Sequence, residues 1–323
     1  MRRPIERQVP SAEILALLIA VLFASPLVLS AADLNQQTLQ AWEEYVQGTN
    51  SQMKQRLTGT GTFLWIDEAP GRRERVRAGE ILVEPGSKNN PQKVPQGLIH
   101  DWLGAVFIPN ATITSVLATL NDYGRYDQFY NPTVIEAKLL NASGAVRNFS
   151  LVLAEKAPFV TAAIASEYNS RIIRIDKSHW YTVTYSTRVQ QIDNFGEPGA
   201  HELPPDQGAG YIWRLFSIER FEEQDGGVYA ELEALALSRN IPFEIQWIVK
   251  PILQHLPRNS MTATLQKTRE AVWSEASAKA APPATNPPSV VGSKKPDATT
   301  AAGHSLTIRP ISPAAALRMH VLN

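Results

Sequence analysis

One stretch of the sequence decides the fold: Gly97-Leu98-Ile99-His100-Asp101-Trp102-Leu103-Gly104-Ala105-Val106-Phe107-Ile108-Pro109. Its long apolar run predicts an extended strand, and the residues from Pro109 onward stop it. A short helix is expected next, because Thr112 can cap the first turn and the apolar residues before Asn121 fall on one stripe. An aromatic-rich connection over residues 123–132 follows this helix.

Downstream, extended segments alternate with turn-forming residues. Strands are expected over 134–140, 147–155, 159–168, 180–192, 211–221 and 228–237, with hairpin turns at 141–144, 169–170 and 224–227. Helices are predicted over 243–256, with a kink at Pro251, and over 257–273. This order predicts an α+β fold in which a curved antiparallel sheet wraps around a C-terminal helix. Such an arrangement can leave a cavity between sheet and helix.

Upstream of the deciding stretch, residues 34–57 predict a helix, because their apolar residues recur near helical spacing. Short strands are expected over 62–66 and 79–84. The sequence leaves open whether residues 34–96 add strands to the sheet or pack outside it.

A basic cluster lies in this upstream region, formed by Arg72, Arg73, Arg75 and Arg77. One interpretation is a contact with an anionic ligand or a membrane surface. The favoured interpretation is a solvated loop or edge strand, because charge runs usually belong to solvent-facing segments.

The two ends of the chain are not expected to belong to the fold. The N-terminus joins a basic start, an apolar run over 14–29 and the small residues Ser30-Ala31-Ala32, which are the parts of a secretory signal. We expect cleavage after Ala31 or Ala32, with an uncleaved membrane anchor as the alternative. Residues 274–323 are rich in Ala and Pro, which predicts a disordered tail.

Composition excludes several classes of function. The chain has 31 basic and 31 acidic residues, and this balance argues against nucleic-acid binding through a basic surface. It has no cysteine, which excludes disulfides, thiolate nucleophiles and iron–sulfur clusters. None of the 6 histidines has the helical spacing of a metal pair, and nucleotide-binding glycine motifs are absent. We therefore predict no metal, no cofactor and no assigned catalytic residue.

The quoted stretch, its helix and the segment Leu120-Asn121-Asp122-Tyr123-Gly124-Arg125-Tyr126 resemble the opening of the START-like family, also called the SRPBCC or polyketide-cyclase-like superfamily. The hairpin at Asp225-Gly226-Gly227-Val228 and the broken helix after residues 237–242 resemble its ending. The resemblance covers about residues 97–273. It implies a helix-grip fold with a cavity for lipids, sterols, polyketides or other apolar molecules. The family has no universal catalytic residues, so none is carried over.

Four parts follow from these observations. We expect a signal peptide over 1–32, an N-terminal helix with short strands over 33–96, a START-like ligand-binding domain over 97–273 and a disordered tail over 274–323.

Strand alternation and the implied fold give candidates for the cavity lining. Tyr181 and Tyr185 share the face of their strand that looks buried, and small apolar residues suggest room for a ligand on the last strand. The predicted ligand-binding residues are His100, Trp102, Tyr123, Tyr126, Tyr181, Tyr185, Trp213, Leu215, Leu232, Ala234, Ala236, Ile248 and Ile252. The tyrosines at 123 and 126 could gate a cavity mouth or form a satellite hydrophobic cluster, and the second is favoured.

Charged residues gather on the other face of the last hairpin. A two-residue Asp225-Gly226 turn would place Arg220 opposite Glu231, with Glu233 and Arg214 on the same face. A headgroup-binding arginine is one interpretation, and cross-strand ion pairs at the surface are the favoured one.

The sequence as a whole predicts an exported binding protein, periplasmic or secreted, that holds a lipid, a quinone or a hopanoid- or sterol-like molecule. Transient membrane contact is compatible with this role, and the oligomeric state stays open. One alternative is a cyclase- or dehydratase-like enzyme on a polyketide-like substrate, with His100, Tyr185 or Arg214 as acid or base. Another is an interaction module that recruits a partner through the tail or the Arg72–Arg77 cluster.

Overall fold

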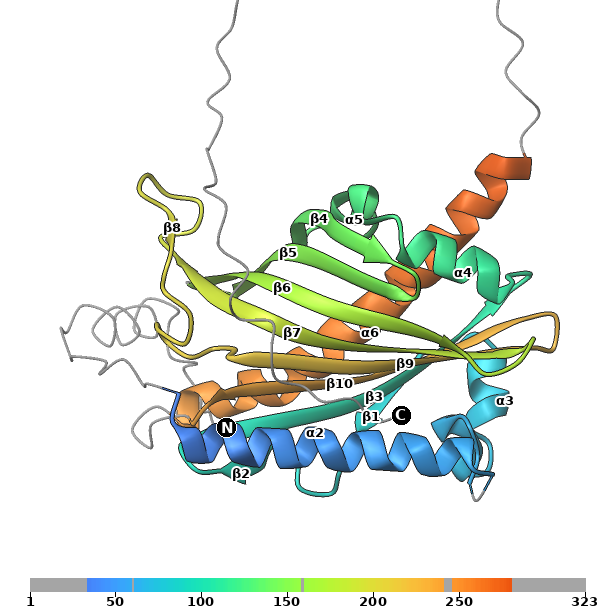
Figure 1. Cartoon of the computed structure of the whole chain (residues 1–323), viewed down its shortest axis with the longest axis horizontal. Coiled ribbons are helices and arrows are strands. Elements are labelled where there is room, and N and C mark those ends of the chain that lie inside the picture. Colours follow the sequence, from blue (N-terminus) through green and yellow to red (C-terminus); the bar gives the residue numbers. More distant parts are fainter. Residues whose placement is uncertain (1–33, 60, 158–159, 241–245, 281–323) are drawn as a thin grey trace, which may run out of the picture. The chain divides into compact units, whose positions relative to one another are not determined.

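The computed structural model describes residues 34–59, 61–157, 160–240 and 246–280 (Figure 1). The predicted signal peptide and most of the predicted tail lie outside these residues. The helices are α2 (Gln36–Leu57), η1 (Trp65–Glu68), α3 (Arg72–Arg77), α4 (Ile113–Leu120), η2 (Tyr123–Arg125), α5 (Tyr126–Phe129) and α6 (Gln246–Ala280). The strands are β1 (Leu82–Pro85), β2 (Gln92–Val94), β3 (Gly97–Pro109), β4 (Val134–Ser143), β5 (Val146–Ala157), β6 (Val160–Arg174), β7 (His179–Asp193), β8 (His201–Glu202), β9 (Arg214–Gln224) and β10 (Gly227–Arg239).

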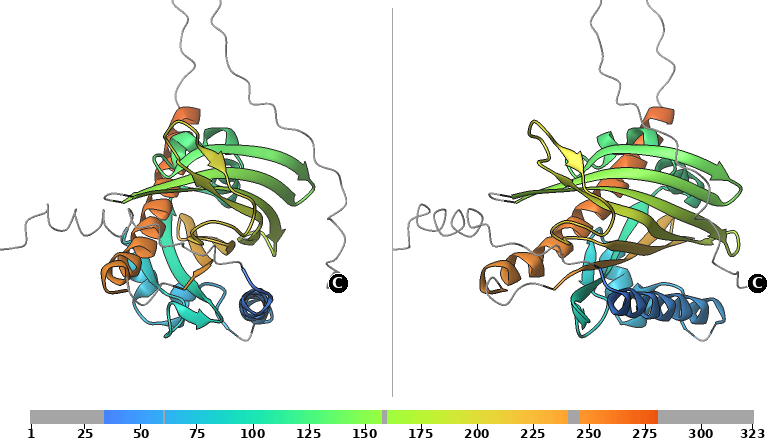
Figure 2. Two further views of the ribbon diagram at one scale, coloured as in Figure 1. Left: turned by 90° about the vertical axis from the view of Figure 1, so that its left-hand side faces the viewer. Right: turned by 60° about the vertical axis from the view of Figure 1, so that its left-hand side comes forward.

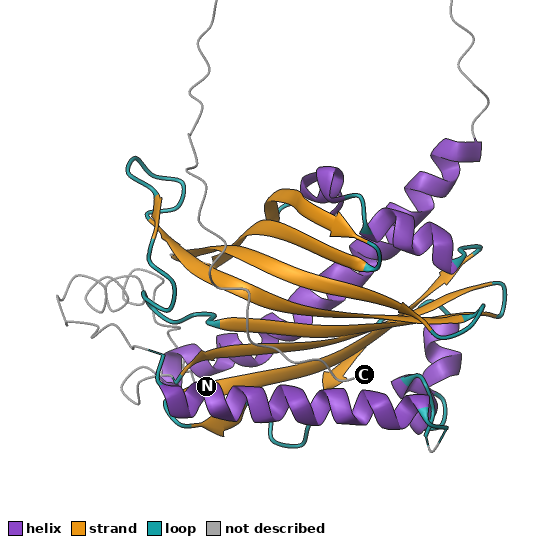
Figure 3. Cartoon of the chain, viewed as in Figure 1, coloured by secondary structure: helices purple, strands orange, loops and turns teal. Residues whose placement is uncertain are grey.

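The described strands form one antiparallel sheet of 10 strands in the order β1-β3-β10-β9-β7-β6-β5-β4. The short strands β2 and β8 pair with β3 and β7. The sheet curves and α6 crosses one of its faces, as Figures 1 and 3 show. The predicted fold class is therefore confirmed: a curved antiparallel sheet with a long C-terminal helix, preceded by an N-terminal helical extension.

The deciding stretch forms β3, which pairs with β10 along its whole length, from Gly97↔Arg239 to Pro109↔Gly227. Strand β10 in turn forms a hairpin with β9. Asp225 and Gly226 turn this hairpin with φ values of 58° and 78°, the left-handed conformation that tight two-residue turns require. The turn fixes the register, so that Arg220 lies opposite Glu231 as predicted.

Helix α4 begins where the sequence predicts. Thr112 accepts a hydrogen bond from the Ser115 amide at 3.2 Å, and the Ser115 hydroxyl accepts one from the Thr112 amide at 3.0 Å. This reciprocal cap satisfies amides that the first helical turn leaves without partners. The helix then packs against α6.

Helix α6 packs directly on β3. A side chain at Gly104 would place its Cβ 2.6 Å from Leu265 Cδ1 of α6, so Leu265 would have to shift for any larger residue. The face of the sheet that meets α6 is called the α6 face below.

The N-terminal region both extends the sheet and packs on its other face, which resolves the alternative left open by the sequence. Strands β1 and β2 pair with β3. Trp42 and Met53 of α2 pack with Ile99, Ile218 and Leu235 in one buried cluster. This second face is called the α2 face, and Figure 2 shows α2 and α6 on different sides of the strands.

Several predicted elements differ in the structure. Residues 62–66 do not form a strand: Trp65 and Ile66 belong to η1, because their amides bind the Glu231 carboxylate instead of a neighbouring strand. The basic cluster is the short helix α3 rather than a loop or edge strand.

Two boundaries also differ. Ser170 is not in a turn, because it pairs with Thr184 inside the long β6–β7 hairpin, whose turn follows Arg174. The predicted C-terminal helices are one helix, which continues past Trp273 to Ala280.

Candidate functional site

The α6 face of the sheet can be recognised from the residues that pack against the helix. Val106 of β3, Ala230 of β10 and Phe221 of β9 join Met261 and Leu265 of α6 in one buried cluster. Because side chains alternate along a strand, even-numbered residues of β3 and β10 and odd-numbered residues of β9 share this face.

Small residues cross the middle of the α6 face in one row. The register places Ala234, Ser217, Thr184 and Ser170 side by side on β10, β9, β7 and β6. The first three are only half-buried although they lie on central strands, and Ser170 is buried. This set, the small-residue row, presents short side chains where the sheet faces α6. Short side chains there leave surface that a ligand can cover.

Glu219 lies beside the small-residue row on β9, two residues from Ser217. Its cross-strand neighbours are Leu232 of β10 and Thr182 of β7. Thr182 Oγ1 donates a hydrogen bond to Glu219 Oε2 at 2.7 Å. Burial raises the pKa of the Glu219 carboxyl, and the Thr182 hydrogen bond offsets part of that shift. Within the described part of the chain, no Lys, Arg or His forms an ion pair with Glu219.

An aromatic cluster adjoins this surface. Phe149 of β5 stacks between Tyr123 and Tyr168, with ring centroids 4.6 and 5.0 Å away. Tyr126 and Leu215 pack against the same cluster, which therefore links the η2–α5 segment to the α6 face. Burial raises the pKa of Tyr168 to about 12, so its hydroxyl stays protonated at neutral pH.

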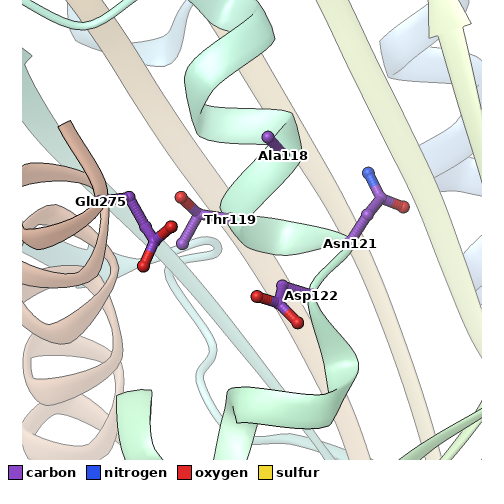
Figure 4. A pocket seen from close by; sticks show the side chains of 5 residues that line it. All are labelled: Ala118, Thr119, Asn121, Asp122 and Glu275. Atoms are coloured by element: carbon purple, nitrogen blue, oxygen red, sulfur yellow. The ribbon is translucent and has the colours of Figure 1, made fainter. Parts of the chain in front are cut away.

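A pocket of about 340 Å³ lies at the end of α4, as Figure 4 shows. Its walls are largely polar: Ala118, Thr119, Asn121, Asp122 and Glu275. Glu275 of α6 also accepts a hydrogen bond from Arg125. Polar walls of this kind do not suit an apolar ligand, so this pocket is not the predicted cavity.

The structure brings together most of the predicted lining residues that it describes. On the α6 face or against its aromatic cluster lie His100, Trp102, Tyr123, Tyr126, Leu215, Leu232, Ala234 and Ala236. His100 Nε2 is 3.0 Å from Ser238 Oγ, and burial lowers the pKa of the imidazole. Their role in ligand binding stays a prediction.

Three predicted lining residues are misplaced. Tyr181, Tyr185 and Trp213 pack beneath α2, on the face opposite α6. Side-chain alternation showed correctly that Tyr181 and Tyr185 share one face of β7. Both faces of β7 are covered, however, so the apolar character of a face does not show whether it meets α6 or α2. The side chains of Ile248 and Ile252 lie outside the described residues.

The charged group on the last hairpin is buried rather than at the surface, which corrects the favoured interpretation. Arg220 is 0% exposed, Glu231 1% and Glu233 8%. Arg220 Nη1 and Nη2 donate to Glu233 Oε2 at 2.9 and 2.5 Å, and its Nε lies 3.5 Å from Glu231 Oε2. Burial raises the pKa of both carboxyls, and Arg220 opposes that shift. Arg214 instead forms an ion pair with Asp206 at 2.6 Å.

Glu219 and the hydroxyl residues of the small-residue row were missed as site residues. The available signal was the polar alternation of β7, where Thr182 and Thr184 share the face opposite Tyr181 and Tyr185. Their pairing with Glu219 and Ser217 shows that this face points to α6.

Comparisons with known proteins found matches among solved structures. No family model and no curated protein matches the sequence. Among solved structures, the chain resembles a STAR-related lipid transfer protein from Xanthomonas axonopodis, at 17% identity and a TM-score of 0.39, over 56% of this chain and 96% of that one.

Human STARD10 is similar at 10% identity and a TM-score of 0.37, over 59% of this chain and 75% of that one. The Zhui aromatase/cyclase from Streptomyces sp. R1128 is similar at 11% identity and a TM-score of 0.38, over 55% of this chain and 96% of that one. At such identities and scores the likeness carries no argument about the family or the ligand of this chain.

Proposed function

We propose that this chain binds an apolar ligand, without catalysis, between the α6 face of the sheet and α6. The observation that carries the proposal is the small-residue row, where Ala234, Ser217 and Thr184 keep accessible surface on central strands beneath a helix. Covering apolar surface there would contribute about 25 cal/mol per Å² to binding. The candidate ligands are acyl lipids, quinones and hopanoid- or sterol-like molecules.

The enzyme alternative is weakened by where its candidate groups lie. Tyr185 packs beneath α2, and Arg214 is paired with Asp206, so neither lies with His100 on the α6 face. A binding role needs no such convergence of acid and base.

We also propose that the protein is exported, on the strength of the signal-like sequence over residues 1–32. None of the described helices combines the length and hydropathy needed to cross a bilayer. An exported carrier would meet lipids or quinones in the periplasm or outside the cell.

The proposal is tested by native mass spectrometry and lipid extraction of the full chain purified from an exporting host. A stoichiometric apolar molecule is the expected result. Ala234→Phe should then abolish co-purification, because its ring fills the small-residue row, whereas Ala234→Ser should retain the ligand. A folded Ala234→Phe variant that keeps its ligand would overturn this placement.

A further inference from the structure

Glu219 is the one acidic side chain that the register places in the middle of the α6 face, next to the small-residue row. It has a single hydrogen-bond partner among the described residues, Thr182, which binds Oε2. No described residue donates a hydrogen bond to Oε1. A carboxylate can accept several hydrogen bonds, so acceptor capacity remains on the side chain.

On the opposite face of the β9–β10 hairpin, Glu231 and Glu233 are satisfied by the protein itself. Glu231 accepts hydrogen bonds from the amides of Trp65 and Ile66, both at 2.9 Å, and Glu233 is bound by Arg220. Buried charges are normally paired in this way, because an unpaired one loses its hydration without replacement. Among the described residues Glu219 has neither a cation nor a backbone amide as partner, and it lies where the proposed ligand would bind.

We propose that Glu219 selects the polar end of the ligand, favouring an apolar molecule with a hydrogen-bond donor, a protonated amine above a hydroxyl, and rejecting a carboxylic acid. This inference rests on the proposed function, since it assumes a ligand on the α6 face. A protonated amine would supply both the missing donor and the missing counter-charge. An ionised acid would place a second negative charge beside Glu219 in a poorly solvated site.

The test compares three probes with one ten-carbon tail: decylamine, 1-decanol and decanoic acid. Their affinities are measured at neutral pH by isothermal titration calorimetry, each below the concentration at which it aggregates. The full chain should bind decylamine most tightly, decanol next and decanoic acid weakest. Glu219→Gln should weaken decylamine binding roughly 10- to 100-fold, the value of a charge-assisted hydrogen bond, and strengthen decanoic acid binding.

The control is Glu167→Gln, which removes a carboxyl from the opposite face of β6, where Glu167 lies 3.4 Å from Arg188. It should leave the order of the three probes unchanged. Equal binding of all three probes, or an order that survives Glu219→Gln, would overturn the role of Glu219 while leaving the apolar site standing. No binding of any probe would overturn both the role of Glu219 and the proposed function.

Discussion

The two faces of the sheet hold buried carboxylates in different ways. On the α2 face, Glu231 accepts from the amides of Trp65 and Ile66, and Asp101 accepts from Tyr45, so both are bound by the N-terminal segment. Glu233 on the same face is bound by Arg220 of the neighbouring strand. On the α6 face, Glu219 accepts one hydrogen bond, from Thr182 on the neighbouring strand. The α2 face therefore uses carboxylates to hold the N-terminal segment in place, whereas the described part of the N-terminal segment provides no partner for Glu219.

The largest expected effect comes from breaking the charge cluster of the α2 face. Arg220→Met should reduce the free energy of unfolding by about 3–5 kcal/mol, because it leaves Glu231 and Glu233 buried without their cation. Urea denaturation at neutral pH measures the change. Arg188→Met is the control, since Arg188 is partly exposed and lies 3.4 Å from Glu167. A loss below about 1 kcal/mol for Arg220→Met, the range of surface pairs, would contradict the assigned role.

A smaller loss of stability is expected when the hydrogen bond between α2 and β3 is removed. The Tyr45 hydroxyl donates to Asp101 Oδ2 at 2.7 Å. Tyr45→Phe should cost about 1–3 kcal/mol in urea denaturation, because Asp101 stays buried and loses that donor. Tyr211→Phe serves as the control, since Tyr211 is exposed. Equal stabilities of the two variants would show that this hydrogen bond does not hold the helix.

Glu219→Gln should instead increase the free energy of unfolding, and this increase should grow with pH. Burial raises the pKa of Glu219, so the stability associated with its neutral form is complete at acidic pH and is lost as pH rises through the folded-state pKa. Glutamine does not ionise, and the other buried carboxyls are common to both proteins. The difference in unfolding free energy should therefore be near zero at pH 4 and increase toward pH 8. A difference that does not vary with pH would contradict the raised pKa.

Local signals predicted much of the fold. The apolar run of β3, the Thr112 cap and the Asp225-Gly226 turn all act over a few residues, so the sequence alone revealed them. The 62–66 segment could not be predicted in the same way. Its amides are bound by Glu231, a residue far along the chain, and this contact replaces the strand pairing that local propensity favours.

The site was harder to predict because both faces of the central strands are covered. Alternation sorted β7 correctly into two sets, but it could not say which set meets α6 and which meets α2. Tyr181 and Tyr185 were therefore assigned to the wrong side. The burial of Arg220 was missed for the same reason, since nothing local showed that the α2 face lies beneath a second layer.

The smallest effect is expected from an ion pair that neither face buries. Arg75 of α3 binds Glu80 at 2.8 and 2.5 Å, with both side chains about half exposed. Arg75→Ala should leave the urea midpoint unchanged, because water and salt screen a pair at this position. The same variant tests whether the basic cluster recruits a membrane, through sedimentation with anionic phospholipid vesicles. Loss of vesicle binding at unchanged stability would show that the cluster recruits membranes. No change in either measurement would show that Arg75 is a solvated residue, and that the charges important for stability lie on the two faces of the sheet.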